Sequence, residues 1–223
     1  ADFKRQIAEQ REVPEAILGA MQAMPKDALP MDVLQASVPM MANYDPDIQS
    51  TDIDSATRMA VRLTAKFPTI VAAWDRIRNG KEPVAPDSSL SHAANFLYMF
   101  HNGVEPDPLV ARIMDVCFIL HAEHSINAST FAAMVTGSTL ATPSYVIAAA
   151  IGTLAGPLHG GANEHVIQML QEIGSPENAR TWLDKKLAAK EVIWGMGHRE
   201  YKVKDPRATL LQKLMNELAR SRG

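Results

Sequence analysis

Three segments of the sequence place histidines beside glycines or small polar residues, a composition typical of reactive or ligand-binding loops. They read HAEHSINAS at residues 121–129, GPLHGGAN at residues 156–163 and GMGHREYKVKDPR at residues 195–207. Imidazole exchanges protons near neutral pH, donates hydrogen bonds to carbonyls and binds metals. These segments are therefore the first candidates for a catalytic or binding site.

The first segment contains His121 and His124, which are neighbours on one face if the segment is helical, with Asn127 on roughly the same face. Such a pair is compatible with zinc or iron. However, the segment is not an HExxH motif, and the other clusters of ligands that a metal site needs are missing from the sequence. We therefore favour a site without metal, and we expect His121 to hydrogen-bond the end of a helix.

In the second segment, His159 precedes a helix that we expect to begin near Gly161. The positive end of a helix disfavours a protonated imidazole. A neutral imidazole can still donate one hydrogen bond to a carbonyl oxygen and thereby stabilise an enolate. Gly160 and Gly161 allow a ligand or another part of the backbone to approach closely. A glycine-rich hinge with an incidental histidine explains this segment equally well.

The third segment combines His198 with several cations. Arg207 carries the planar guanidinium that grips a carboxylate through two hydrogen bonds, whereas Lys202 and Lys204 suit the diffuse charge of phosphates. The two glycines that precede the histidine could expose backbone groups to a flat ring. A solvated basic loop is the alternative, and it explains the lysines better than it explains the Gly-His-Arg cluster.

The net charge of −3 averages two unlike parts of the chain. Residues 180–223 hold 11 of the 22 Lys and Arg but only 5 acidic residues, which gives them a net charge of +6, while residues 1–179 carry −9. This asymmetry suggests that the C-terminal part meets an anionic ligand, although a solvated basic face has the same composition.

The elements that must position these segments are helices, because apolar residues recur at helical spacing nearly throughout and no strand alternation is visible. The predicted fold class is all-α. We expect Pro39 to kink or end one helix, and Pro68 lies inside another. The start of the chain, residues 1–21, also reads as helical. The other predicted helices cover residues 15–24, 30–41, 51–77, 91–100, 108–121, 129–140, 144–154, 162–173, 179–190 and 205–219.

The composition is that of an ordinary globular chain with room for one or two domains: 223 residues, 47% hydrophobic and 21% charged. The longest apolar stretch, at residues 145–154, is too short to span a bilayer. The single cysteine, Cys117, excludes a disulfide framework and suits a reducing compartment. The sequence contains no phosphate-binding glycine motif of the P-loop or dinucleotide type.

Taken together and in this order, the three segments resemble the histidine motifs of the citrate synthase family. HAEHSINAST resembles the first motif, GPLHGGANE the second and GMGHREYKVKDPRA the third. The similarity extends over the whole chain and is weakest over residues 1–89. It implies an all-α, two-domain citrate synthase-like fold that is incomplete at both ends. The large, dimer-forming domain would cover residues 1–158, and the small, CoA-binding domain residues 159–223.

The resemblance also implies a reaction, in which acetyl-CoA and oxaloacetate condense to citryl-CoA, which is hydrolysed to citrate and CoA without any metal or redox cofactor. The implied catalytic residues are His159, which would stabilise the enolate of acetyl-CoA, and His198, which would polarise the oxaloacetate ketone. The implied carboxylate-binding residues are His124, Asn127 and Arg207. The implied CoA-binding residues are Val192, Ile193, Gly195, Gly197, Lys202 and Lys204.

The sequence departs from the family in one respect. The aspartate that serves the family as catalytic base lies well beyond the DPR motif, in a part that this sequence does not contain, and Asp205 of that motif is no substitute for it. We therefore expect an internal portion of a longer enzyme, inactive by itself. The alternatives are a 2-methylcitrate synthase acting on propionyl-CoA and a non-catalytic dimerisation fragment.

The remaining expectations concern partners and location. We expect a homodimer, or a higher oligomer built from it, with the alanine-rich helices at residues 129–140 and 144–154 as the contact. Packing of these helices within one subunit is the alternative. We expect a bacterial-type cytoplasmic location, and neither nucleic acid nor a membrane as a partner.

Overall fold

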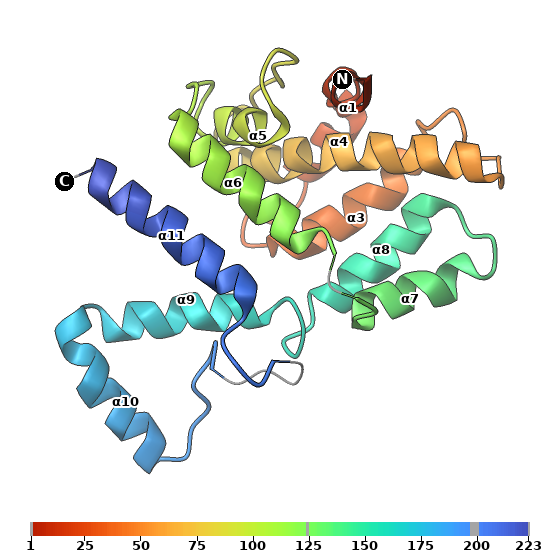
Figure 1. Ribbon diagram of the computed structural model, residues 1–223. Helices are drawn as coiled ribbons and strands as arrows, with labels where there is room; N and C mark the ends of the chain where they lie inside the picture. Colours follow the sequence, from red (N-terminus) through yellow and green to blue (C-terminus); the bar gives the residue numbers. More distant parts are fainter. Residues whose placement is uncertain (1, 124, 197–200, 223) are drawn as a thin grey trace.

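The computed structural model describes residues 2–123, 125–196 and 201–222. Within these residues the chain forms α-helices and one 3-10 helix and no strand, which confirms the predicted all-α class (Figure 1). The elements are α1 (Asp2–Glu9), α2 (Glu15–Gln22), α3 (Pro30–Ala42), α4 (Ile53–Arg78), α5 (His92–Phe100), α6 (Pro108–His121), α7 (Ala128–Gly137), α8 (Pro143–Leu154), α9 (Ala162–Ile173), η1 (Pro176–Asn178), α10 (Ala179–Ala188) and α11 (Pro206–Ser221).

Helix starts follow the local sequence closely. Five of the described helices, α4, α5, α6, α7 and α11, begin after a short polar side chain that accepts a backbone N–H of the first turn. Such a cap satisfies a donor that has no partner inside the helix and contributes about 1 kcal/mol. The capping residues are Asp52, Ser91, Asp107, Asn127 and Asp205.

The prolines do not end the helices that contain them. Pro39 lies inside α3, which continues to Ala42, and Pro68 lies inside α4, which continues to Arg78. By contrast, α7 ends at Gly137, earlier than predicted, and Leu140 beyond it adopts a positive φ of 60°. The helical periodicity therefore located the helices, whereas their C-terminal ends depended on the local backbone conformation.

The hydrophobic core lies where α2, α3, α4 and α8 meet. Trp74 of α4 is only 1% exposed and belongs to a cluster whose other members are aliphatic or methionine side chains from all four helices. Burying such a side chain stabilises the fold by about 1.5–3 kcal/mol. The buried members of this cluster are Ile17, Met21, Val33, Val38, Met41, Leu63, Ile70, Ala73, Trp74, Ile77, Ala148 and Ile151.

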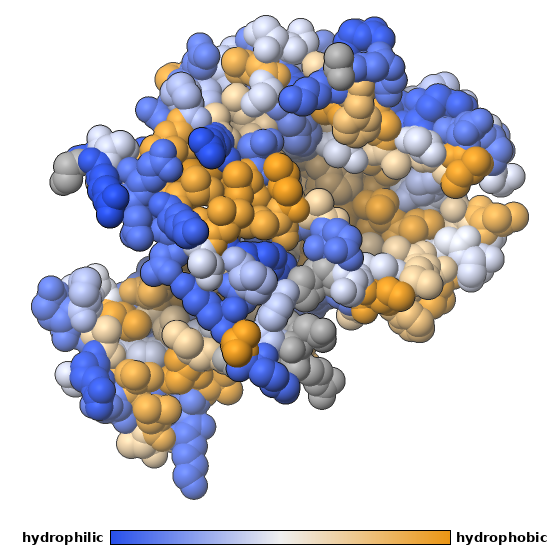
Figure 2. All heavy atoms as spheres, viewed as in Figure 1, coloured by the Kyte–Doolittle hydropathy of each residue, from blue (hydrophilic) through white to orange (hydrophobic). Residues whose placement is uncertain are grey.

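The helices after residue 158 are arranged differently. In Figure 1, α9 and α10 form an arm that projects from the main body, whereas α11 returns and lies beside α6, which it contacts. The arm has no buried residue in α9 or α10, and Ile167 and Leu170 are more than half exposed. Apolar side chains gather at the surface over the arm and over α6 (Figure 2). The division into two domains after residue 158 stays a prediction.

No helix in the described part of the chain is both long enough and apolar enough to cross a membrane.

Candidate functional site

The turn that carries His159 is held tightly between α8 and α9. The His159 N–H donates to Gly156 O at 2.9 Å, and α9 begins at Ala162, so the histidine precedes the start of a helix as predicted. A Cβ added to Gly160 would lie 2.8 Å from Leu154 O, and one added to Gly161 would lie 2.8 Å from Ala155 O. Because Gly160 and Gly161 have no side chain, the backbone at the end of α8 can lie close to this turn. The sequence suggested that either a ligand or another part of the backbone would approach here, and the structure shows the backbone.

His159 is bound to the first turn of α7. Its Nε2 lies 2.9 Å from Ser129 Oγ and accepts the Ser129 backbone N–H at 3.4 Å. Ser129 Oγ donates in turn to Asn127 Oδ1 at 2.7 Å, and the same oxygen accepts the Thr130 N–H at 2.9 Å. The structure therefore joins two of the predicted site residues, Asn127 and His159, through a serine that the sequence analysis did not select.

The contact with the Ser129 backbone indicates which nitrogen of His159 accepts a hydrogen bond. A backbone N–H can only donate, so Nε2 must present its lone pair to Ser129. A neutral imidazole then has its proton on Nδ1, on the opposite side of the ring. The arrangement thus leaves Nδ1 to donate one hydrogen bond to a ligand.

Arg207, the predicted carboxylate ligand, is paired with a carboxylate of the chain itself. Its Nη2 lies 2.7 Å from Asp205 Oδ2, and its Nε lies 3.1 Å from the same oxygen. This ion pair raises the pKa of Arg207, so the guanidinium stays charged. Nη1 points instead to Leu120 O, at 3.4 Å, near the end of α6. One edge of the guanidinium is therefore occupied by Asp205, and Nη1 lies against the last turn of α6, just before the connection between α6 and α7.

The predicted site residues converge on that connection, residues 122–127. Arg207 contacts α6 just before it, and His159 contacts α7 just after it. His124 belongs to it but lies outside the described residues. His121, at the end of α6, places Nδ1 2.6 Å from Cys117 O, which confirms the expected hydrogen bond to a helix end.

The described part of the predicted CoA-binding segment, which begins at Val192, lies within residues 191–196, a stretch that leaves α10 and reaches α9. Gly195 has a positive φ of 80°, and a Cβ there would lie 3.3 Å from Val166 Cγ2 of α9. Val192 is exposed and Ile193 is half-buried. The chain here is thus a short non-helical strip lying against α9. Gly197 and His198, which continue the predicted site, lie outside the described residues.

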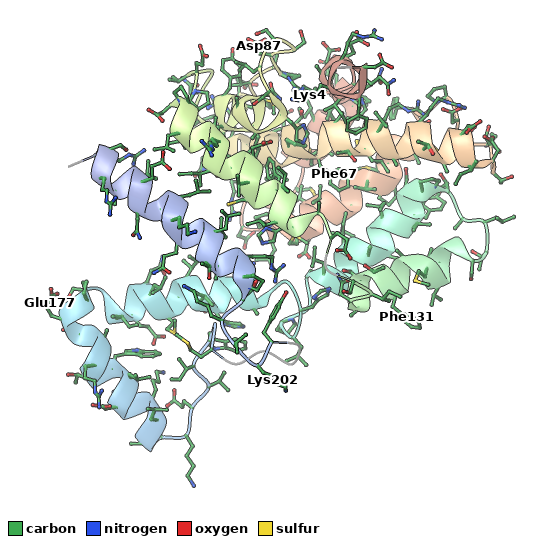
Figure 3. All side chains as sticks on the ribbon, viewed as in Figure 1. Lys4, Phe67, Asp87, Phe131, Glu177 and Lys202 are labelled. Carbon is green, nitrogen blue, oxygen red and sulfur yellow. The ribbon has the colours of Figure 1, made fainter. Side chains whose placement is uncertain are left out.

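The two predicted phosphate ligands occupy the loop before α11. Lys202 is exposed, and Figure 3 shows it on this loop, beyond the helices. Lys204 Nζ donates to Gln212 Oε1 at 2.5 Å, so it is directed toward α11. Of the two lysines, Lys202 is the one whose side chain is displayed to solvent in a way that suits a charged ligand.

Two further features bear on the kind of site. Among the described residues, no group of three or more His, Cys, Asp or Glu side chains is placed to hold a metal ion. An apolar cavity of about 870 Å³ runs along α4 between Phe96 and Val146, and none of the described site residues lines it. The candidate site is therefore the convergence around residues 122–127 and not this cavity.

Sequence reasoning missed two residues of this convergence. Ser129 is an ordinary residue of a first helical turn, and Asp205 reads as a helix cap, which it also is, because its Oδ1 accepts the Arg207 N–H at 2.8 Å. The sequence does show three polar residues close together at the start of a helix, Asn127, Ser129 and Thr130. It does not show that Ser129 contacts His159.

Comparison with known proteins places this geometry in a family. All of residues 1–223 match the family model described as "Citrate synthase, C-terminal domain". The chain is 49% identical over 222 residues to the citrate synthase of Synechocystis sp., covering 100% of this chain and 56% of that protein. It is 40% identical over 216 residues to the 2-methylcitrate synthase of Mycobacterium tuberculosis, covering 97% of this chain and 54% of that protein. The chain thus spans a little more than half the length of these curated relatives.

Solved structures agree. The crystal structure of citrate synthase from Pyrobaculum aerophilum matches with a TM-score of 0.90 at 39% identity, over 100% of this chain and 57% of that one. A ternary complex of the Thermoplasma acidophilum citrate synthase with carboxymethyl-CoA and oxaloacetate matches with a TM-score of 0.88 at 27% identity, over 99% and 57% of the two chains. These matches confirm the resemblance of the three histidine segments, and this chain belongs to the citrate synthase family.

Proposed function

We propose that this chain serves the condensation of acetyl-CoA with oxaloacetate to citryl-CoA and the hydrolysis of citryl-CoA to citrate and CoA. The observation that carries the proposal is the contact of His159 with Ser129, in which Nε2 accepts the Ser129 N–H and Nδ1 is left to donate. The names of the relatives and the ligands of the Thermoplasma acidophilum complex support the same reaction.

In this proposal, His159 stabilises the reactive form of the thioester. Its Nδ1–H donates to the thioester carbonyl oxygen as a base removes a methyl proton, so the negative charge of the enolate develops on an oxygen that already has a donor. The methyl carbon then attacks the ketone carbon of oxaloacetate. The polarising donor at that ketone is His198, which the resemblance assigns to this role.

The carboxylates of oxaloacetate are assigned to Arg207, Asn127 and His124. Arg207 is suited to this role because it stays charged, and because Asp205 holds its Nε–Nη2 edge whereas Nη1 makes only a long contact, 3.4 Å, with Leu120 O. A substrate carboxylate therefore shares the guanidinium with Asp205 and does not have to displace it. Asn127 reaches the same region from the start of α7.

CoA is assigned to the strip at residues 191–196 and to the loop before α11. Val192, Ile193, Gly195 and Gly197 would lie along the adenine, and Lys202 would meet a phosphate. Lys204 is the weaker of the two lysines, because its ammonium is engaged by Gln212 and must be released first. The thioester is itself the substrate, and the proposal requires no other cofactor.

We propose a homodimer in which α7 meets a second copy of the chain. Its Phe131, labelled in Figure 3, is 62% exposed, and Met134 and Val135 beside it are more than half exposed, while α8 buries Ala148 and Ile151 in its own subunit. Light scattering on a sizing column should give twice the chain mass, and Phe131→Lys should shift it to the monomer. A monomeric wild-type chain would contradict the dimer, and a mass above twice that value would indicate the higher oligomer.

The activity can be tested by release of the CoA thiol. The first protein is the 223-residue chain, and the second is a chimera in which these residues replace their counterparts in the Synechocystis citrate synthase. We expect CoA release from acetyl-CoA and oxaloacetate by the chimera and negligible release by the chain alone, because the resemblance assigns the base to a segment that the chain does not contain. A chimera that folds but releases no CoA would overturn the proposed reaction.

The second candidate reaction is 2-methylcitrate synthesis, which the 40% identical Mycobacterium tuberculosis relative favours. One methylene changes the discrimination between acyl chains by only about 1–3 kcal/mol, so both thioesters must be assayed. A higher kcat/KM for propionyl-CoA than for acetyl-CoA in the chimera would select this reaction. We also propose a bacterial-type cytoplasmic location and, for the isolated chain, a non-catalytic role.

A further inference from the structure

The strip that is proposed to bind CoA is attached to α9 by an aromatic stack. The indole of Trp194 and the imidazole of His165 have ring centroids 4.2 Å apart and planes 20° from parallel. Both side chains are half-buried. Neither ring belongs to the hydrophobic core, which is formed by α2, α3, α4 and α8. The stack therefore holds the strip against α9 in a part of the molecule that lies outside the hydrophobic core.

A second contact, next to the first on both elements, fixes the strip in the same place. Gly195 follows Trp194, and Val166 follows His165; the Gly195 Cα lies so close to Val166 that an added Cβ would stand 3.3 Å from Val166 Cγ2. Gly195 also has a φ of 80°, a conformation that glycine adopts without strain. Two successive residues of the strip thus meet two successive residues of α9.

The orientation of the imidazole is itself constrained. His165 Nδ1 lies 3.3 Å from Gln168 Oε1, on the next turn of the same helix, so the ring has a polar partner at one edge and the indole on its face. An imidazole held in this way offers a defined surface for stacking.

The helix that receives this stack is the one that begins beside His159. The Ala162 N–H donates to His159 O at 3.3 Å, and His165 lies one turn further along α9. Helix α9 thus connects two parts of the proposed CoA site. His159, proposed to bind the thioester end of acetyl-CoA, lies at its start, and the strip proposed to bind the adenine end packs on its first turns. If the binding sites for both ends of a long ligand are already fixed on one helix, less conformational entropy is lost when the ligand binds.

We propose that Trp194 and His165 are positioning residues for CoA: their stack fixes the strip at residues 191–196 against α9, at a set distance from His159. This inference rests on the proposed function, because it takes the strip to be the CoA site. The pair acts through the strip and makes no contact with the reacting atoms. An aromatic pair of this kind corresponds to a change of about 2- to 12-fold in affinity.

The experiment measures CoA binding and loop order in the 223-residue chain. Trp194→Leu and His165→Ala should each weaken CoA binding by about 2- to 12-fold in calorimetric titrations, and the double variant should lose little more than either single variant, because both break one stack. Amide hydrogen exchange at residues 191–196 should accelerate in all three. Trp194→Phe should restore most of the affinity, since it keeps an aromatic face.

Trp182→Leu is the matched control. Trp182 is also half-buried in the arm, but it lies on α10, where its Nε1 donates to Glu172 Oε2 at 3.2 Å and Lys186 Nζ lies 5.3 Å from its ring. Because Lys186 also donates to Glu191 Oε2 at 2.6 Å, the replacement can change exchange at Glu191, but it should leave CoA affinity and exchange at residues 192–196 unchanged. In the chimera, Trp194→Leu should raise KM for acetyl-CoA and leave kcat and KM for oxaloacetate unchanged, as expected for positioning.

The outcomes separate this inference from the function on which it rests. Equal CoA affinity in the wild-type chain and in Trp194→Leu would overturn the positioning role and leave the proposed reaction standing. Equal loss of affinity in Trp182→Leu would also overturn it, because the effect would then belong to the arm in general. A wild-type chain without affinity for CoA, together with a folded but inactive chimera, would overturn the proposed function and this inference with it.

Discussion

His159 Nε2 accepts the backbone N–H of Ser129 at 3.4 Å and lies 2.9 Å from the Ser129 hydroxyl oxygen. A residue in the first turn of α7 thus sets the tautomer of the histidine that precedes α9. The contact also ties the region after residue 158 to the region before it. Because the N–H belongs to the backbone, no side-chain substitution other than proline removes it, which makes the tautomer a property of the fold.

The tautomer is directly measurable. We expect nitrogen-15 spectra of the 223-residue chain near neutral pH to show His159 with a protonated Nδ1 and an unprotonated Nε2, because the Ser129 N–H occupies the lone pair of Nε2. Ser129→Ala should preserve this pattern, since it removes only the hydroxyl. A protonated Nε2 in the wild-type chain would contradict the hydrogen-bond assignment and the proposed donor.

Removal of the imidazole should affect turnover far more than oxaloacetate binding. In the chimera, His159→Ala should lower kcat by about 10²–10³-fold, the usual effect of deleting a donor to a developing oxyanion, with little change in oxaloacetate affinity. His121→Ala is the control, because that imidazole is engaged by Cys117 O at the end of α6. A kcat unchanged by His159→Ala would remove this residue from the mechanism.

Arg207 should be sensitive to the shape of its side chain and not only to its charge. Arg207→Lys keeps one positive charge but loses the forked donor that Asp205 and a substrate carboxylate would share. We expect KM for oxaloacetate in the chimera to rise by about 10-fold or more, with KM for acetyl-CoA unchanged. Arg220→Lys, in the last turn of α11, should change neither value.

The stability of the main body should fall in acid because of an ion-pair network on α4. Arg58 Nη2 lies 2.6 Å from Asp47 Oδ1 and Arg62 Nη2 lies 2.5 Å from Asp47 Oδ2; these hydrogen bonds, from Arg58 first, hold the pKa of Asp47 well below its ordinary value. The folded state therefore binds this proton less readily than the unfolded state. The contribution of the ionised Asp47 to the free energy of unfolding is therefore present above about pH 4 and is lost as the pH falls further.

Urea unfolding at about pH 6 and about pH 3 tests this network. Asp47→Asn should lower the unfolding midpoint at the higher pH and shrink the difference between the two midpoints. Asp27→Asn, in an exposed turn before α3, should leave both midpoints as in the wild-type chain. A pH dependence identical in wild-type and Asp47→Asn proteins would assign the acid sensitivity to other carboxyl groups.

A buried arginine holds the long loop between α4 and α5. Arg11 is only 3% exposed, and its guanidinium donates to Asp87 O and to Leu90 O, the latter at 2.9 Å. Arg11→Met should lower the free energy of unfolding by about 2–4 kcal/mol, because it leaves two carbonyls without donors. Arg5→Met, on the exposed face of α1, should change it by less than about 0.5 kcal/mol. Similar losses in both variants would show that the loop carbonyls are satisfied in another way.

Much of the fold was accessible from the sequence. The 3.6-residue periodicity of apolar side chains identified the helices, and the position of His159 just before a helix followed from the glycines and the new periodic run after them. These features are set by residues within one or two turns of each other, so they can be read locally. The helix ends were less accessible, as the early ends of α7 and α10 show.

The connections that give the site its chemistry were not accessible. The sequence by itself determined the family, the helices and the residue types of the three histidine segments. Only the tertiary structure decided that Ser129, 30 positions from His159, holds its Nε2, that Asp205 takes one edge of Arg207, and that Trp194 stacks on His165. Local spacing determines which helix forms and where it begins. It does not determine which helix ends meet or which rotamers they select, because these depend on the packing of segments far apart in the chain.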